Sequence, residues 1–201
     1  LFRERVGLPF WVEARPESVN EDTVALLQET GCEGISVGVE SGNVKLRKEL
    51  LGRQVDDEII IRAFDLLRKS GIRVSANNII GFPTETREMI FDTIRLDRRL
   101  QPDGVMVSFF SPYKGASLRD LCEELGYIQD EEIARDYRLG PSMDMPQLRA
   151  SEIVGLHRTF PLYVKFPESE WERIRLAEQD SAEGNAIFAE YSERYTRQFM
   201  S

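Results

Sequence analysis

Short apolar segments alternate with amphipathic segments along the first half of the chain. Four apolar segments are rich in β-prone residues and short enough for strands, at residues 10–14, 34–40, 73–80 and 105–110. Between them, apolar residues recur every three or four positions, which predicts helices at residues 20–30, 57–70 and 89–100. A further helix is expected after the turn at residues 41–43.

Residues that start and stop helices support this division. Asn20 can cap the free amide groups at the start of the first helix, and Gly31 and Gly71 stand where a helix ends in a left-handed conformation. Gly81-Phe82-Pro83 makes a turn after the third strand, with Thr84 as the expected cap of the next helix. The helix boundaries therefore agree with the periodicity.

Strands that are separated by single helices are typical of right-handed βαβ units, which build a parallel sheet with helices outside. Four strands are too few to close an eight-stranded barrel, so the fold is α/β, either an open sheet or an arc of a barrel. After residues 111–112 the pattern predicts helices alone, at residues 117–125, 130–137, 151–164 and 168–200. We read these helices as a C-terminal extension that lies over the sheet edge.

Composition narrows the function classes. The 201 residues include 26 basic and 35 acidic side chains, and the net charge of −9 repels phosphate backbones, so no nucleic-acid partner is expected. No apolar stretch approaches the ~20 residues that span a bilayer, which predicts a cytoplasmic protein with no membrane partner. The chain begins at Leu1, without an initiator methionine, and we expect it to be part of a longer protein.

Polar residues follow the predicted strands at their carboxyl ends, where parallel α/β sheets bind ligands. The candidates are Glu13, Glu40, Ser41, Asn77, Asn78, Gly81 and residues 110–113. Carboxylate, amide and hydroxyl groups at one rim can bind a ribose diol and a cation. The residues alone therefore predict a site for a polar small molecule.

Several motifs in order resemble the radical S-adenosylmethionine (radical SAM) superfamily, whose fold is a partial (β/α)6 barrel. They are Gly38-Val39-Glu40-Ser41-Gly42, Arg53, residues 78–86, the Pro-x-x-Gly-x-x-Leu turn at residues 112–118, and the tail stretches 145–148 and 158–164. The branch that also carries an N-terminal cobalamin-binding domain is the most similar. The resemblance covers residues 10–164 and implies strands 3 to 6 of the barrel in residues 1–128, with a helical extension in residues 129–201.

The resemblance also implies a role for each candidate in binding SAM. Glu13 would face the methionine amino group, Glu40 the ribose hydroxyls, and Arg53 the methionine carboxylate. Asn77 or Asn78 would reach the ribose or the amino group, since one of the two faces inward. The remaining implied contacts are to adenine, with Ile79 and Gly81 flanking the ring and Phe110, Pro112 and the backbone of residues 111–113 at its edge.

The superfamily binds a [4Fe-4S] cluster through a C-x3-C-x2-C loop, and no such triplet is present among the 201 residues. Cys32 and Cys122 are expected to be small buried hydrophobes. The chain alone should therefore be inactive as a radical enzyme. The resemblance places the cluster loop upstream of Leu1, together with a cobalamin-binding domain where one is present.

Alternatives remain open for both the residues and the function. Glu13 and Arg53 could be solvated charges, and His157 is expected to be a packed or surface residue without a chemical role. The expected partners are a small-molecule substrate, a reductant protein and a second copy at the open sheet edge. Two other readings are a non-catalytic module for a nucleotide-like ligand or a partner, and a hydrolase that uses Glu13 and Glu40 as an acid and base pair.

Overall fold

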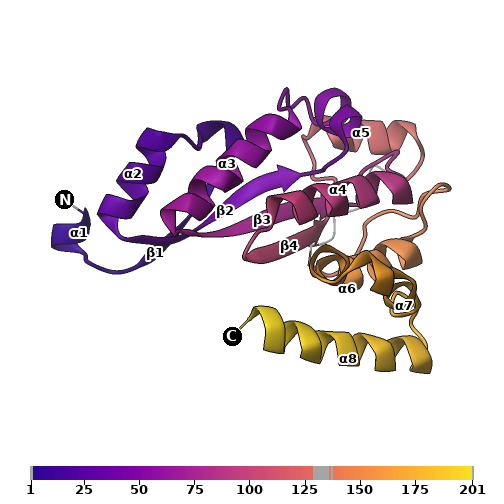
Figure 1. Cartoon of the computed structure of the whole chain (residues 1–201). Coiled ribbons are helices and arrows are strands. Elements are labelled where there is room, and N and C mark those ends of the chain that lie inside the picture. The colour runs from indigo at the N-terminus through magenta and orange to yellow at the C-terminus, as the bar shows by residue number, and fades with distance from the viewer. Residues whose placement is uncertain (1, 129–135, 137, 201) are drawn as a thin grey trace.

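The computed structural model describes residues 2–128, 136 and 138–200 of the chain. Its four strands form one sheet of parallel strands in the order β1-β2-β3-β4 (Figure 1). The strands are β1 Phe10–Ala14, β2 Cys32–Glu40, β3 Arg73–Ile80 and β4 Gly104–Phe109. The predicted α/β class, the parallel sheet and the four strands are confirmed.

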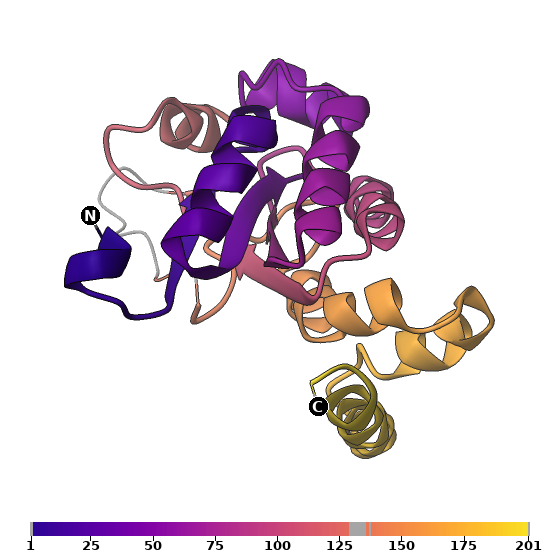
Figure 2. The same ribbon diagram turned by 60° about the vertical axis from the view of Figure 1, so that its left-hand side comes forward.

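Three helices connect the strands and cover one face of the sheet (Figure 2). They are α2 Glu21–Thr30, α3 Asp57–Ser70 and α4 Arg87–Leu100. The Asn20 side chain accepts a hydrogen bond from the Thr23 amide at 2.9 Å, and Gly31 ends α2 at φ +84°. Two short elements, α1 Phe2–Arg5 and the 3-10 turn η1 Pro16–Ser18, flank β1.

Of two local predictions in this half, one is confirmed and one is wrong. The segment after β2 is helical at residues 44–50, as predicted, and most of it is the π-helical turn η2 Leu46–Leu50. The cap of α4 is Thr86, whose side chain accepts from the Met89 amide, whereas Thr84 has a left-handed backbone with φ +69°. A β-branched residue rarely adopts that conformation, so the turn before α4 is held by its surroundings.

The second half of the chain is helical, with α5 Ser117–Glu124, α6 Ala150–Lys165, η3 Glu168–Glu170, α7 Trp171–Leu176 and α8 Ala182–Phe199. The single helix expected at 168–200 is therefore wrong, because the chain turns between α7 and α8. The helix expected at 130–137 lies outside the described residues except for Asp136. Among the described helices, none is long and apolar enough to cross a membrane.

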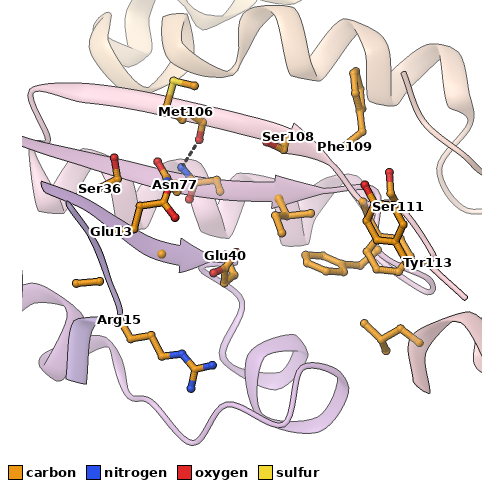
Figure 3. Close-up of a pocket in the computed structure, with 17 residues that line it drawn as sticks. Glu13, Arg15, Ser36, Glu40, Asn77, Met106, Ser108, Phe109, Ser111 and Tyr113 are labelled. Atoms are coloured by element: carbon orange, nitrogen blue, oxygen red, sulfur yellow. Dashed lines mark hydrogen bonds between the residues drawn. The ribbon is translucent and has the colours of Figure 1, made fainter. Parts of the chain in front are cut away.

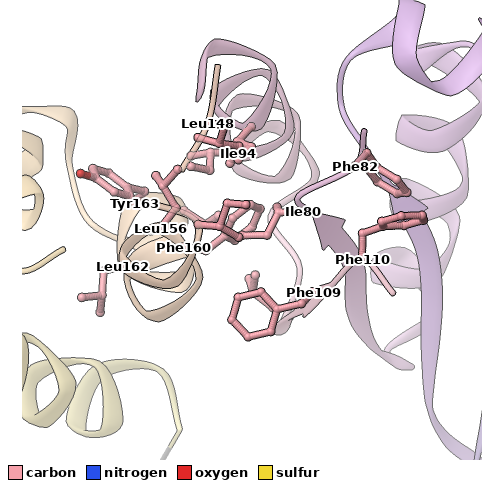
Figure 4. Packing of buried hydrophobic residues seen from close by; sticks show 14 of the residues in the cluster. Ile80, Phe82, Ile94, Phe109, Phe110, Leu148, Leu156, Phe160, Leu162 and Tyr163 are labelled. Atoms are coloured by element: carbon pink, nitrogen blue, oxygen red, sulfur yellow. The ribbon is translucent and has the colours of Figure 1, made fainter. Parts of the chain in front are cut away.

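The core has two clusters. One fills the space between β2, β3, α2 and α3, where Val37, Val39, Ala63, Phe64 and Leu67 are fully buried. The other joins β4 and α4 to the C-terminal helices (Figure 4). The extension thus packs over the β4 edge of the sheet, as expected.

His157 on α6 belongs to this packing against β4. Its ring stacks on Phe109 with centroids 4.0 Å apart, and Nε2 lies 3.0 Å from the Val107 carbonyl oxygen. Burial lowers the pKa of His157, so the neutral ring is favoured. These contacts support the prediction of a packed histidine.

Candidate functional site

The inner face of the sheet, opposite the α2–α4 layer, carries a cavity of about 820 Å³ near the carboxyl ends of the strands (Figure 3). Side chains alternate along each strand, so the outer set packs on the helices and the inner set lines the cavity. The lining residues are Glu13, Ala14, Arg15, Ser36, Gly38, Glu40, Asn77, Asn78, Ile79, Phe82, Met106, Ser108, Phe109, Phe110, Ser111, Tyr113 and Leu118. Polar side chains come from all four strands, whereas the aromatic side chains come from the end of β4 and the residues after β3 and β4.

Glu40 stands at an irregularity in β2. The register between β2 and β3 shifts between Gly38 and Glu40, and Glu40 has φ +65°. This conformation is uncommon for a residue with a side chain. It turns the carboxylate back along the strand towards the inner face, where Glu40 lines the cavity.

Arg53 reaches the end of β2 from the loop before α3. Its Nη1 donates to the Gly38 carbonyl oxygen at 3.0 Å and to Glu40 Oε1 at 3.2 Å, and its Nη2 lies 3.5 Å from Glu17 Oε2. Burial raises the pKa of Glu40, and Arg53 opposes that rise. A guanidinium group next to a half-buried carboxylate at a strand end can bind an anionic or zwitterionic ligand.

The structure distinguishes the two asparagines of β3. Asn78 is 2% exposed and faces α4, where its Nδ2 donates to Asp97 Oδ2 at 2.7 Å. Asn77 faces the cavity beside Glu13 and Ser36 (Figure 3). Its Oδ1 is buried and has no hydrogen-bond partner among the described residues, so Asn77 can accept a hydrogen bond from a ligand.

Four of the predicted site residues do not line the cavity. Arg53 reaches it only through its contact with Glu40, and the other three lie in the surrounding loops. Ser41 is fully buried, with Oγ 3.4 Å from Thr93 Oγ1. The Gly81 amide donates to Glu85 Oε2 at 2.6 Å, and the Pro112 carbonyl oxygen accepts from Arg119 Nη1 at 3.1 Å. In this structure these residues shape the loops around the cavity.

Sequence reasoning missed several lining residues and one buried acid. Ser36 could have been found, because it has the same strand parity as Gly38 and Glu40 on β2. Glu85 is fully buried behind the Gly81 turn, and burial raises its pKa to about 8 although the Gly81 and Phe82 amides donate to it. Gln147 from the C-terminal half of the chain donates to the Glu85 carbonyl oxygen at 3.3 Å, a contact that a local pattern does not reveal.

A metal cluster does not fit the residues present. The sequence has two cysteines, and both thiols are free and buried. No group of three histidine, cysteine, aspartate or glutamate side chains in the described part of the chain is placed to hold a metal ion.

Comparison with known proteins points to one superfamily. A family model described as the radical SAM superfamily matches residues 2–96. An uncharacterized methyltransferase of Pyrococcus horikoshii is 28% identical over 164 residues, which cover 82% of this chain and 35% of the relative. The anaerobic magnesium-protoporphyrin IX monomethyl ester cyclase of Rubrivivax gelatinosus is 26% identical and is matched over 63% of this chain and 22% of its own length.

Solved structures show the same fold. The radical SAM methyltransferase TsrM from Kitasatospora setae superposes with a TM-score of 0.51 at 24% identity, covering 61% of this chain and 24% of that one. Elp3 from Methanocaldococcus infernus superposes with a TM-score of 0.54 at 16% identity, covering 92% of this chain and 41% of that one. The chain spans about a third or less of the length of the two curated relatives described above.

Proposed function

Because a model of the radical SAM superfamily matches residues 2–96, we propose that the chain belongs to that superfamily and that its inner-face cavity forms part of the SAM site of a radical enzyme. The whole protein would reduce SAM to methionine and a 5′-deoxyadenosyl radical that acts on a small-molecule substrate. The observation that carries the proposal is the convergence of Glu13, Asn77 and the Glu40–Arg53 pair at one end of a cavity whose other end is aromatic.

The polar end matches the charged and hydroxylated parts of SAM. Carboxylates accept hydrogen bonds from ammonium and hydroxyl groups, which suits Glu13 and Glu40 to the methionine amino group and the ribose diol. Arg53 donates to Glu40 at 3.2 Å, and a guanidinium group beside Glu40 is suited to bind the methionine carboxylate. The unpartnered Asn77 Oδ1 adds a further acceptor.

The other end of the cavity suits the adenine ring. Ile79, Phe82 and Phe110 line it, and the Phe82 and Phe110 rings lie 5.1 Å apart (Figure 4). Flat apolar side chains of this kind pack against a base. The Gly81–Glu85 hydrogen bond holds the turn that carries Phe82, so Gly81 contributes to this wall through its backbone.

The C-x3-C-x2-C triplet that holds the electron-supplying [4Fe-4S] cluster in this superfamily is absent from these 201 residues. We propose that a part of the protein outside residues 1–201 provides the cysteines, and that a reductant protein reduces the cluster. Cobalamin binding is a further proposal for that part, supported by similarity to the cobalamin-containing branch and by TsrM, whose structure was determined with cobalamin and a cluster bound.

The test is SAM binding, followed by SAM cleavage in the iron-reconstituted whole protein. We expect the 201-residue chain to bind SAM, and Glu40→Gln to weaken binding by at least tenfold. Glu33→Gln, at the opposite end of β2, is the matched control and should bind normally. Binding without 5′-deoxyadenosine formation by the whole protein would favour the non-catalytic module, and no binding by either form would refute the proposal.

A further inference from the structure

Arg47 has the largest side chain that is fully buried among the described residues, with 1% of it exposed. It lies in the π-helical turn η2, between the end of β2 and the start of α3. Taking a guanidinium group out of water costs several kcal/mol unless its donors are all well used. A buried arginine in a connecting loop therefore indicates that its hydrogen bonds fix a particular arrangement.

The Arg47 guanidinium group binds both ends of the loop that contains it. Nη1 donates to the Ser41 carbonyl oxygen at 2.8 Å, immediately after β2. Nε donates to the Val55 carbonyl oxygen at 3.2 Å and Nη2 to Asp57 Oδ1 at 2.6 Å, at the start of α3. One side chain thus connects the last residues of β2 to the first residues of α3.

The Arg47 main chain extends this connection to Arg53. The Arg53 amide donates to the Arg47 carbonyl oxygen at 2.9 Å, which fixes the backbone from which the Arg53 side chain departs. That side chain then reaches Gly38 and Glu40 at the rim of the cavity. A shift of η2 would therefore move the Arg53 guanidinium group away from Glu40.

The Ser41 carbonyl contact acts on Glu40 from the other side. Glu40 precedes Ser41 and has φ +65°, a conformation that persists only where neighbouring contacts hold it. The Arg47–Ser41 hydrogen bond is one of these contacts, and the Gly42 amide bond to Thr93 Oγ1 at 2.8 Å is another. Arg47 therefore contacts the backbone of Ser41, which follows Glu40, and the backbone amide of Arg53.

We propose that Arg47 is a positioning residue that holds Glu40 and Arg53 in register with each other at the rim of the cavity. It does not line the cavity, and it acts through the loop that carries Arg53 and through the backbone after Glu40. This role rests on the proposed function only where SAM binding is concerned. The geometry of the pair can be tested without any ligand.

The first test is a double-variant cycle read out by the Glu40 carboxyl titration in carbon-13 NMR of the 201-residue chain. Arg53→Met should raise the Glu40 pKa, because Arg53 lowers it in the native chain. In an Arg47→Lys background, where the forked contacts are lost, this shift should shrink to less than half. An equal shift in both backgrounds would mean that Arg47 only stabilises the fold, and the proposal would be wrong.

A second variant keeps the test decisive if Arg47→Lys does not fold. Asp57→Asn weakens the guanidinium contact while leaving Arg47 in place, and it should shrink the same shift to a smaller extent. Arg62→Lys, in an exposed ion pair with Glu21, is the matched control and should leave the shift unchanged. If the shift is equally large in native and Asp57→Asn backgrounds, positioning by Arg47 is excluded.

The second readout is the dissociation constant for SAM. Loss of a residue that couples to the site typically changes affinity on the order of tenfold, so Arg47→Lys should weaken binding by that factor and Arg62→Lys should not. Native affinity in Arg47→Lys would contradict the role in SAM binding. If the native chain itself fails to bind SAM, the proposed function fails, while the Glu40 titration still decides the role of Arg47.

Discussion

The Glu40 carboxylate folds back over Gly38, so that a Cβ atom on Gly38 would lie 2.6 Å from Glu40 Oε1. The absence of a side chain at Gly38 thus creates the space that the carboxylate occupies beside Arg53. The Gly-Val-Glu sequence is therefore needed for steric reasons, because the residue two positions before Glu40 must leave room for the Glu40 carboxylate.

Gly38→Ala should therefore displace Glu40 from Arg53 and weaken SAM binding by at least tenfold, with a smaller effect on the fold. The added methyl group would meet the end of a flexible side chain, which can move away, so the helical content should be unchanged. Isothermal titration with SAM and circular dichroism measure the two effects. Native SAM affinity in Gly38→Ala would show that the Glu40 position is not needed for binding.

Thr84→Gly should stabilise the protein by about 0.5–1 kcal/mol. Thr84 is exposed and has φ +69°, and the left-handed conformation costs a residue with a Cβ atom more than the entropy that glycine loses on folding. Thr30→Gly is the matched control and should destabilise, because Thr30 lies in α2. Urea denaturation of the three proteins gives the free energies, and a loss of stability in Thr84→Gly would contradict the strain argument.

Stability should fall as pH rises from about 5 to about 8. Burial raises the pKa of Asp97 to about 7 and that of Glu85 to about 8, so the folded state keeps protons that the unfolded state has released. The stabilisation is complete below the unfolded pKa values near 4 and is lost as pH passes through the folded values.

Between pH 5 and pH 8, the loss of unfolding free energy should be smaller in Asp97→Asn than in the native protein by on the order of 2 kcal/mol. The reason is that the substitution removes one of the two titrating groups. Asp65→Asn is the control, since Asp65 is exposed beside Arg68 and should leave the slope unchanged. Denaturant unfolding at several pH values measures the slope. The same slope in native and Asp97→Asn proteins would show that Asp97 is already ionised in the folded state.

Short-range sequence patterns correctly predicted the helices and strands whose bounds are set by neighbouring residues. The bounds of α3 and β3 match the prediction because periodicity, Gly71 and the β-prone run all act within a few residues. The face of β3 that meets the cavity could not be predicted, because it depends on how β3 registers with β2 and α4. The asparagine pair shows this, since parity selects one of Asn77 and Asn78 but only the contact with Asp97 says which.

The errors have similar causes. The conformation of Glu40 arises from a register shift between two strands, which a single strand sequence does not encode. The break between α7 and α8 arises where Ser181 caps α8 and Gly184 lies against the carbonyl oxygens of Leu176 and Gln179. Glu178 in this segment is largely buried, with 11% of its side chain exposed, although glutamate side chains are mostly exposed to solvent.

Glu178→Ala should destabilise the protein by about 3 kcal/mol, because it leaves a partly buried partner uncompensated. Glu178 accepts two hydrogen bonds from Arg87 at 2.6 and 2.8 Å and a third from the Tyr163 hydroxyl group, so it joins α4 to α6 and to the end of α7. Glu172→Ala, at an exposed position in α7, should change stability by less than about 0.5 kcal/mol. Thermal unfolding followed by circular dichroism measures both variants.

The same Glu178→Ala variant tests whether Glu178 stabilises only the C-terminal extension or also the ligand site. Arg87 and Tyr163 lie outside the cavity, and their network attaches the C-terminal helices to the outer side of α4. SAM affinity below the unfolding temperature should therefore stay within about twofold of native, since sites without shared partners act nearly additively. A large loss of affinity in the folded variant would instead mean that the extension transmits its packing to the Gly81 turn through α6, where Ile153 lies 3.4 Å from the position of a Gly81 Cβ atom.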